Sequence, residues 1–150
     1  MRAVVQRVGH ARVEIDGHCV AEIGRGILVL LGIEETDGEE DLTWLLGKVA
    51  RMRIHADDAG LMNSALQDIG GEVIVVSQFT LHASTKKGNR PSFLRAARPE
   101  HAEPLYQRFC DLLEKELGHP IGRGVFGADM KVTLMNDGPV TILIDSKQRE

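Results

Sequence analysis

The stretch Val73-Ile74-Val75-Val76-Ser77-Gln78-Phe79-Thr80-Leu81 decides the fold and points to the site. Its four apolar residues at 73–76 form a short continuous run that is typical of a strand in the core. A hydroxyl, an amide and a second hydroxyl follow at Ser77, Gln78 and Thr80. Burying such polar groups costs free energy unless they find hydrogen-bond partners or bind a ligand. The sequence therefore predicts a core strand that ends at a candidate binding site.

A second unusual stretch, Asn136-Asp137-Gly138-Pro139-Val140-Thr141, separates two apolar runs. Proline has no N–H for a sheet ladder, and glycine adopts backbone angles that other residues avoid. We therefore interpret Gly138-Pro139 as a turn between two strands, one at 130–135 and one at 140–144. The carbonyl oxygens of this turn should be presented to a neighbouring group.

The rest of the chain alternates strands with two main helices. Asp16-Gly17 predicts a hairpin over 11–23, and 27–33 is typical of a buried strand. Thr36 and Glu39 have the spacing of a capping box, which predicts that the first helix begins there.

The second helix should end at Gly118, and Pro104 should limit its extension toward the N-terminus. Its apolar face comprises Leu105, Tyr106, Phe109, Leu112, Leu113 and Leu117. The elements together predict an α+β fold, in which two principal helices pack against a curved, mostly antiparallel, barrel-like sheet. No repeat or linker divides the chain, so we expect a single domain over 1–150.

Composition fits a globular protein: the chain has 150 residues, of which 43% are hydrophobic and 27% charged. Residues 1–7 lack the apolar run of a signal peptide, and no stretch approaches the roughly 18 apolar residues of a membrane span. We therefore expect a cytoplasmic protein without a membrane partner. Cys19 and Cys110 are far apart in sequence, and we interpret both as buried thiols in a reducing compartment.

The formal net charge of −4 is distributed unevenly along the chain. Six acidic residues crowd the stretch 34–41, and the sequence does not predict what they do. The stretch 84–98 carries only basic charges, at Lys86, Lys87, Arg90, Arg95 and Arg98. Lys86, Lys87 and Arg90 are candidate contacts for a phosphate-bearing substrate, and a solvated loop is the alternative.

Familiar catalytic motifs are mostly missing. The six histidines have no zinc-ligand spacing, and the glycine-rich stretches match no phosphate-binding loop, so we predict no metal and no cofactor. Ser77 or Thr80 could act as a nucleophile with His82 as base, although no nucleophile-elbow motif surrounds them. A small-molecule esterase with a Thr80 or Ser77 nucleophile and an RNA-binding module without chemistry both stay open as alternatives.

Several motifs in the same order resemble one known family, the D-aminoacyl-tRNA deacylases, also called D-tyrosyl-tRNA deacylases. The motifs are Gln6-Arg7-Val8, Leu30-Leu31-Gly32, Val75 to Leu81, Arg90-Pro91-Ser92-Phe93, Ala128-Asp129-Met130 and Asn136 to Thr141. The resemblance extends along nearly the whole chain. This sequence departs from the family pattern at Asn89 and Gly127, which affects substrate fit, and in the polar tail 146–150.

The resemblance implies a homodimer with its pockets at the subunit interface. Ser77, Gln78, Phe79 and Thr80 would line the pocket of one subunit, and a cis Gly138-Pro139 would enter it from the other. An X-Pro bond adopts the cis form at a cost of only about 0.5–1 kcal/mol. Arg7 would hold the intruding segment. The resemblance also implies that Phe126 and Met130 lie beside the terminal adenosine, and a plain core role is the alternative for both.

The resemblance further implies the reaction. The enzyme would hydrolyse the ester bond of D-aminoacyl-tRNA, and of Gly-tRNA formed by mischarging of the tRNA for alanine. L-amino acids would be excluded sterically. Because the sequence shows no activated Ser-His or Thr-His pair, we also predict that the 2′-OH of the tRNA either activates water or attacks the ester directly. We expect no DNA partner.

Overall fold

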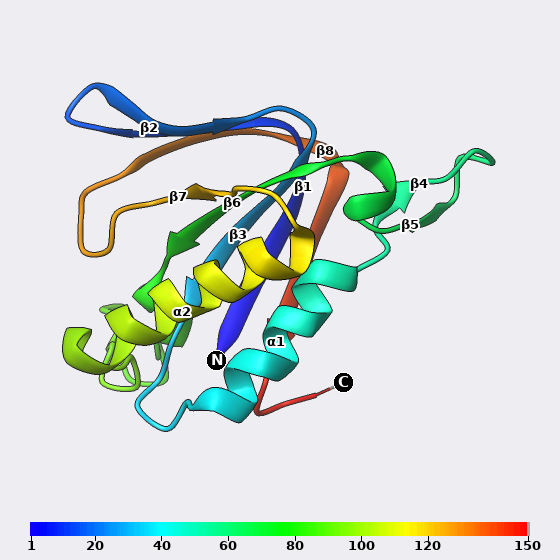
Figure 1. The fold of residues 1–150 in the computed structure, drawn as a ribbon. Coiled ribbons are helices and arrows are strands. Elements are labelled where there is room, and N and C mark those ends of the chain that lie inside the picture. The colour runs from blue at the N-terminus through cyan, green and yellow to red at the C-terminus, as the bar shows by residue number, and fades with distance from the viewer. Residues whose placement is uncertain (150) are drawn as a thin grey trace.

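The computed structural model describes residues 1–149. It begins with two strands, β1 (Arg2–Ile15) and β2 (His18–Ile23), which pair antiparallel (Figure 1). The turn residues Asp16 and Gly17 have φ values of 49° and 78°. Positive φ at both central positions is the geometry that two-residue hairpins favour, because it matches the twist of the strands. The hairpin predicted from Asp16-Gly17 is confirmed.

Four more strands complete the main sheet: β3 (Gly26–Gly32), β6 (Glu72–Ser77), β7 (Gly122–Arg123) and β8 (Lys131–Asp145). β1 pairs antiparallel with β2, β3 and β8, whereas β3 with β6 and β6 with β7 pair in parallel. The order is β2-β1-β3-β6-β7, with β8 on the other side of β1. The sheet curves into a nearly closed, barrel-like form (Figure 1), so the predicted fold class is confirmed.

β8 runs without interruption through Gly138-Pro139, so the predicted turn between two separate strands is wrong. Both halves of β8 pair with β1, and the register shifts where β1 passes from Gln6 to His10. Residues 137–140 have no partner on β1 at that irregularity. A proline therefore costs no ladder hydrogen bond there, and the strand continues beyond it.

The helix α1 spans Glu39–Arg51, and its N-cap is Gly38. The Gly38 N–H donates to the Asp41 carboxylate over 3.1 Å. The prediction that Thr36 and Glu39 form the capping box is wrong, because Thr36 lies within a turn closed by a bond from the Asp37 N–H to the Glu34 carbonyl. Gly38 and Asp41, two positions later in the chain, have the capping-box spacing instead.

The helix α2 spans Pro99–Leu117. Pro99 occupies the first helical position, where its missing N–H is not needed. The predicted limit at Pro104 is wrong: Pro104 lies inside the helix on its exposed side, where water can solvate the carbonyl that loses its bond. The predicted end at Gly118 is confirmed, with a left-handed φ of 75°.

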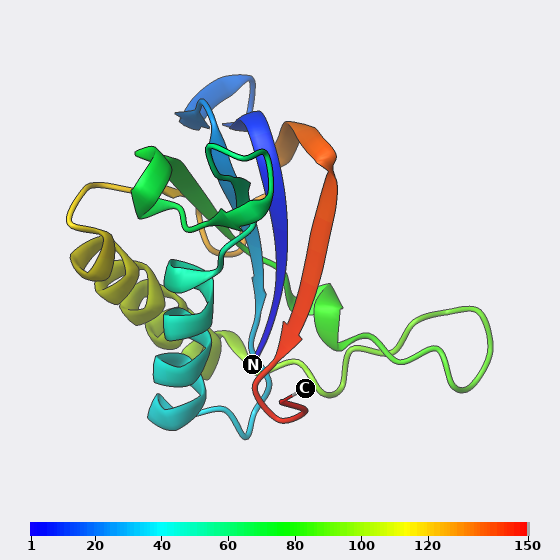
Figure 2. The same ribbon diagram turned by 90° about the vertical axis from the view of Figure 1, so that its right-hand side faces the viewer.

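α1 and α2 lie side by side against one face of the sheet (Figure 2). The main core lies between these helices and the strands, and it includes Val5, Val29, Val75, Leu45, Tyr106, Phe109, Leu113 and Leu117. A second cluster, with Val8, Leu28, Ile74 and Val76 among its members, packs on the opposite face of the strands. The predicted apolar face of α2 is mostly buried, although Leu105 and Leu112 are only partly covered. β6 is therefore buried on both faces, as its apolar run predicts.

The two cysteines differ. Cys110 is buried in α2, as predicted, whereas Cys19 is exposed on β2. The prediction of a buried Cys19 thiol is wrong because β2 is an edge strand of the sheet, and most of its residues face solvent.

The acidic stretch 34–41 is held by the chain termini. The ammonium group of Met1 is fully buried, and it binds the carboxylate of Asp37 and the hydroxyl of Ser146. Ser146 and Lys147 each donate to the Asp41 carboxylate over 2.7 Å. Although burial opposes ionisation of Asp41, these hydrogen bonds lower its pKa to about 2. Most of the tail 146–150 is therefore fixed by contacts, and Glu150 lies outside the described residues.

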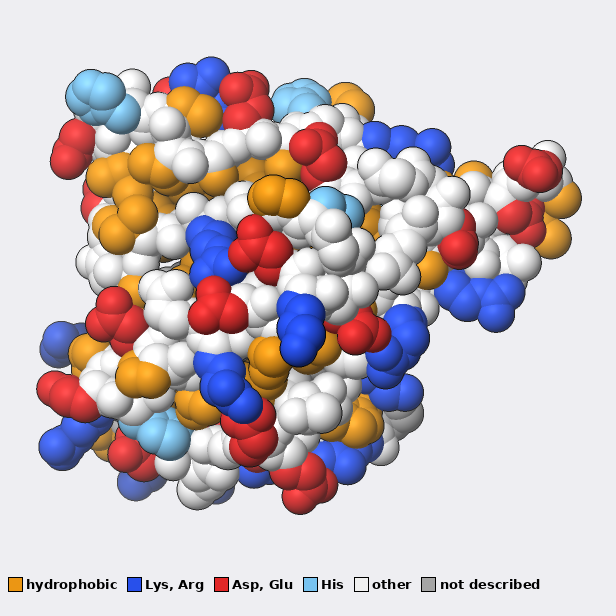
Figure 3. Space-filling model, in the orientation of Figure 1, with side chains coloured by type: hydrophobic (Ala, Val, Ile, Leu, Met, Phe, Trp, Pro, Cys, Tyr) orange, Lys and Arg blue, Asp and Glu red, His pale blue; other side chains and the backbone are white. Residues whose placement is uncertain are grey.

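A small second sheet, formed by β4 (His55–Ala56) and β5 (Met62–Ser64), projects from the body of the molecule and exposes Leu61 and Met62 (Figure 3). Two 3-10 helices, η1 (Gln67–Ile69) and η2 (Phe79–His82), flank β6 in sequence. Within residues 1–149, no helix combines the length and the apolar character that crossing a bilayer requires.

Candidate active site

The chain turns sharply where β6 ends, within the stretch 73–81. The Gln78 N–H donates to the Leu31 carbonyl over 2.8 Å, and the chain then enters η2. A Cβ on Gly32 would lie 2.9 Å from the Gln78 carbonyl oxygen and 3.0 Å from the Leu81 Cβ. The end of β3 can therefore approach η2 this closely only because residue 32 is glycine.

A cavity of about 630 Å³ opens beside this turn. Its lining residues are Val76, Ser77, Gln78, Phe79, Phe93, Ala96, Ala97, Arg98, Pro99, Phe126, Gly127, Ala128, Asp129, Met130 and Val132. The structure thus brings together five residues that the sequence singled out, namely Ser77, Gln78, Phe79, Phe126 and Met130. Thr80 does not line the cavity, and its hydroxyl accepts a hydrogen bond from the Gln78 side-chain amide over 2.6 Å.

Aromatic side chains form much of the cavity wall. The Phe79 ring is 56% exposed and meets Phe93 edge to face, with ring centroids 5.1 Å apart. The ring centroid of Phe126 lies 6.1 Å from that of the buried Tyr106. The Tyr106 hydroxyl is 2.9 Å from the Val75 carbonyl and 3.1 Å from that of Gly124, to either of which it can donate. Burial raises the pKa of Tyr106, so the hydroxyl keeps its proton and links α2 to β6 and to the segment before Phe126.

His82 is buried, and neither of its ring nitrogens has a hydrogen-bond partner among residues 1–149. Burial lowers the pKa of His82, so the ring is neutral near pH 7. The histidine therefore makes no hydrogen bond to Ser77 or Thr80. The arrangement required for a Ser-His or Thr-His pair is not formed in the described part of the chain.

The main-chain N–H groups of Phe79 and Thr80 make no hydrogen bond within residues 1–149. Phe79 lines the cavity, and Thr80 follows it in η2. Two adjacent free N–H groups are the usual way in which proteins bind an oxyanion.

Gly138 and Pro139 are exposed, joined by a cis peptide bond, and outside the cavity of their own chain. The side chain of Arg7 holds this segment: its Nε donates to the Asp137 carbonyl over 2.8 Å, and its Nη1 donates to the Ile54 carbonyl over 2.7 Å. Gly138 has a φ of 140°, and a Cβ there would lie 2.9 Å from the Arg7 Nη2. Glycine is thus required at 138 for both its backbone angle and its closeness to Arg7.

The predicted basic loop projects from the body below β8 (Figure 2). A pair of backbone hydrogen bonds between Ser84 and Ser92 closes its base. Lys86, Lys87 and Arg90 lie beyond that closure, are exposed, and do not line the cavity. The structure therefore does not bring these three side chains to the strand end.

Sequence reasoning missed several residues of the cavity, above all Phe93, Arg98 and Asp129. Phe93 belongs to a quoted motif and Arg98 to the basic stretch, so each carried a weak signal. Within residues 1–149, no three His, Cys, Asp or Glu side chains lie close enough to hold a metal ion.

The sequence matches the family model described as D-Tyr-tRNA(Tyr) deacylase over residues 4–145. The D-aminoacyl-tRNA deacylase of Bacteroides thetaiotaomicron is 59% identical over 150 residues, which cover 100% of each chain. That of Dechloromonas aromatica is 58% identical, also over 100% of each chain.

Two solved structures have the same fold. One, named c-Myc DNA Unwinding Element Binding Protein, is 42% identical with a TM-score of 0.90, covering 97% of this chain and 98% of that one. The other, a probable eukaryotic D-amino acid tRNA deacylase, is 17% identical with a TM-score of 0.81, covering 95% and 97%. The family match, the full-length relatives and the predicted motifs agree, and this chain belongs to the D-Tyr-tRNA(Tyr) deacylase family of hydrolases.

Proposed function

We propose that this protein hydrolyses the ester bond of D-aminoacyl-tRNA in the cytoplasm, with residues 1–150 acting as one domain. One observation carries the proposal: Ser77, Gln78 and Phe79 at the strand end line a cavity of about 630 Å³, and the main-chain N–H groups of Phe79 and Thr80 have no partner within residues 1–149. Cavities of about 300–1,000 Å³ are typical of small-ligand sites. This one is large enough for a terminal adenosine with its amino acid.

The aromatic wall suits the adenosine. Bases stack on exposed aromatic rings, and each stacked base contributes about 1–3 kcal/mol. Phe79 and Phe93 are both partly exposed at the cavity, and Phe126 and Met130 complete an apolar surface. We assign Phe126 and Met130 to the adenosine and the strand end to the aminoacyl group.

The second part of the site comes from a second copy of the chain in a homodimer. Gly138-Pro139 is exposed, yet it is held by Arg7 and by the Asn136 side chain, which accepts a bond from the Val140 N–H over 2.7 Å. An ordered, exposed loop that has no role in its own chain's cavity is well suited to enter a partner's cavity. Its backbone would then occupy the position that an L side chain requires.

Steric exclusion explains the substrate range. A rigid backbone wall rejects every L-amino acid by one clash, whereas positive recognition would need different contacts for each D side chain. Glycine has no side chain to clash, so Gly-tRNA formed on the tRNA for alanine becomes a second substrate.

For the chemistry, we propose that the N–H groups of Phe79 and Thr80 stabilise the oxyanion that forms when water attacks the ester carbonyl. The bond from the carbonyl carbon to the 3′ oxygen then breaks, and that oxygen takes a proton. Because His82 contacts neither hydroxyl, the neighbouring 2′-OH of the substrate is the group that activates the water. Ser77, Gln78 and Thr80 act by positioning.

A small-molecule esterase and an RNA-binding module without chemistry are the competing functions. We expect the protein to deacylate D-Tyr-tRNA with a kcat/KM at least about 100-fold above that for D-tyrosine methyl ester, because contacts to the RNA contribute binding energy that a small ester lacks. p-Nitrophenyl acetate should persist. Rapid cleavage of the small esters would favour the esterase, and tRNA binding without hydrolysis would favour the binding module.

The shared site can be tested with a heterodimer purified through two different tags. One subunit carries Pro139→Ala and the other Phe79→Ala, a change at an exposed ring that folding tolerates. One of the two sites then combines an intact cavity with an intact Gly138-Pro139, so the heterodimer should have about half of the wild-type activity. The Pro139→Ala homodimer should be nearly inactive, and the Phe79→Ala homodimer, which loses a stacking ring, should be clearly less active than the heterodimer.

Deacylation assays and light scattering on the same samples provide the measurement. A monomer with full activity, or a heterodimer no more active than the two homodimers, would contradict the shared site.

A further inference from the structure

The charged residues that line the cavity are Arg98 and Asp129, so Arg98 is the one cation among the lining residues that the structure describes. The Asp129 carboxylate lies 2.9 Å from the Lys131 ammonium, which offsets its charge. The guanidinium of Arg98 makes no ion pair or hydrogen bond within residues 1–149. It is exposed at the edge of an otherwise largely apolar cavity.

The backbone that carries Arg98 is fixed. The Arg98 N–H donates to the Glu35 carboxylate over 3.2 Å, and the Ala97 N–H donates to the Ile33 carbonyl over 2.9 Å. α2 begins at the next residue. The main chain at Arg98 is therefore held by Ile33, which directly follows β3, by Glu35 of the acidic stretch and by the start of α2, while its side chain stays free to bind.

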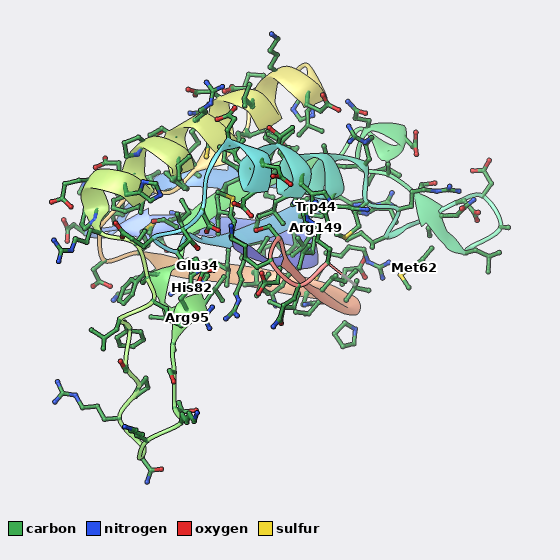
Figure 4. The ribbon with its side chains drawn as sticks, turned by 90° about the horizontal axis from the view of Figure 1, so that it is seen from below. Glu34, Trp44, Met62, His82, Arg95 and Arg149 are labelled. Carbon is green, nitrogen blue, oxygen red and sulfur yellow. The ribbon has the colours of Figure 1, made fainter. Side chains whose placement is uncertain are left out.

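An ion pair three residues before Arg98 also anchors this segment of the chain. The Arg95 guanidinium lies 2.9 Å from the Glu34 carboxylate, and the His82 ring lies beside the same carboxylate at 3.7 Å (Figure 4). Because Glu34 takes up the charge of Arg95, only Arg98 of this segment has a free charge at the cavity. The two arginines have different roles: Arg95 anchors the segment, and Arg98 is available to a ligand.

We propose that Arg98 binds the phosphodiester that joins the terminal adenosine of the tRNA to the preceding nucleotide. This inference rests on the proposed function for the identity of the nucleoside. With the base on the aromatic wall, the RNA must leave the cavity over its edge, and the first charged group outside the nucleoside is the 5′ phosphodiester. Arginine suits it because its planar fork donates two parallel hydrogen bonds to phosphate oxygens.

The test measures binding of two probes, adenosine and adenosine 5′-methylphosphate, by isothermal titration or NMR. The second probe carries a single negative charge, like the phosphodiester in tRNA. Arg98→Ala should weaken binding of the phosphorylated probe about five- to tenfold, as expected for one charged hydrogen-bonding contact at a partly exposed site. Adenosine affinity should change less than about twofold, and Arg98→Lys should recover part of the loss.

Two control variants separate this contact from general electrostatics. Lys115→Ala removes one exposed charge from the far end of α2, about 26 Å away at 1.5 Å per residue, and should leave both affinities unchanged. Neutralising Lys86, Lys87 and Arg90 should weaken whole-tRNA binding and reduce its salt dependence, because we propose that this loop binds the RNA backbone. It should not change the affinity of adenosine 5′-methylphosphate.

Either of two results would overturn the assignment: equal losses for both probes in Arg98→Ala, which would indicate a structural role, or no loss for either. Failure of this inference can be distinguished from failure of the proposed function. A protein that deacylates D-Tyr-tRNA but shows no phosphate preference retains the function and loses the inference. A protein that prefers the phosphorylated probe through Arg98 but does not deacylate retains the inference as a nucleotide contact and loses the function.

Discussion

D-Tyr-tRNA should lose its amino acid at least about a thousand times faster than L-Tyr-tRNA, a ratio that corresponds to about 4 kcal/mol. One clash between an L side chain and the backbone at Gly138-Pro139 is enough for a difference of this size. D-Asp-tRNA should be cleaved as well, because exclusion does not depend on side-chain chemistry, and Gly-tRNA should be cleaved to some extent. The measurement is the release of labelled amino acid at limiting enzyme.

A pair of glycine variants tests where the discrimination originates. Gly138→Ala introduces a Cβ 2.9 Å from the Arg7 Nη2 and should shift the segment, which lowers the ratio of D to L rates. Gly60→Ala also adds a Cβ at a positive φ, 78°, but meets nothing within 4 Å and lies in the β4–β5 connection. It should leave the ratio unchanged. Equal hydrolysis of D- and L-Tyr-tRNA by the wild-type protein would contradict exclusion altogether.

The core strand at 73–76 could be predicted from the sequence, but the continuity of β8 could not. The run 73–76 was identified as a core strand because burial on both faces requires apolar residues throughout. For residues 130–144 the sequence predicts two strands instead of one, because a proline removes a ladder donor. What the sequence does not display is the register shift on β1, which leaves 137–140 unpaired, so the proline has no bond to break.

The predicted start of α1 was wrong for a related reason. Thr36 carries a good capping side chain, but the turn that Asp37 closes onto Glu34 determines where the helix begins. Asp37 in turn is held by the Met1 ammonium. Local capping preferences are worth about 1 kcal/mol, and a buried ion pair from a distant part of the chain can outweigh them. The use of the acidic stretch was unpredictable for the same reason, since its partners come from both ends of the sequence and from residues 95–108.

The candidate site was predictable where it is continuous in sequence. Ser77, Gln78 and Phe79 line the cavity because they directly follow a buried strand. Phe93 and Arg98 were missed because they reach the cavity through pairing of Ala96 with Glu34, a contact between segments that share no motif. The basic stretch predicts phosphate contacts at Lys86, Lys87 and Arg90, whereas its one basic residue that lines the cavity is Arg98, the last residue before α2.

The second large effect that we expect follows from removing the substrate hydroxyl that takes part in catalysis. A D-Tyr-tRNA that ends in 2′-deoxyadenosine should be hydrolysed at least about 100-fold more slowly than the normal substrate, yet bind with similar affinity. The 3′ ester is unchanged in this tRNA, and only the hydroxyl that activates water is lost, so the effect should fall on the rate and not on binding. Single-turnover rates and equilibrium binding on the same two tRNAs provide the measurement.

The protein's own hydroxyl should matter far less. Thr80 already accepts a hydrogen bond from Gln78 at 2.6 Å, and His82 makes no hydrogen bond that could activate it. Thr80→Val, which keeps the shape and removes the hydroxyl, and Thr80→Ala should both retain activity within about fivefold of wild type, since a positioning bond contributes about 1 kcal/mol. Normal turnover of the 2′-deoxy substrate, or an acyl group trapped on Thr80, would instead establish a covalent esterase mechanism. The two variants and the two tRNAs together decide whether the essential hydroxyl belongs to the enzyme or to its substrate.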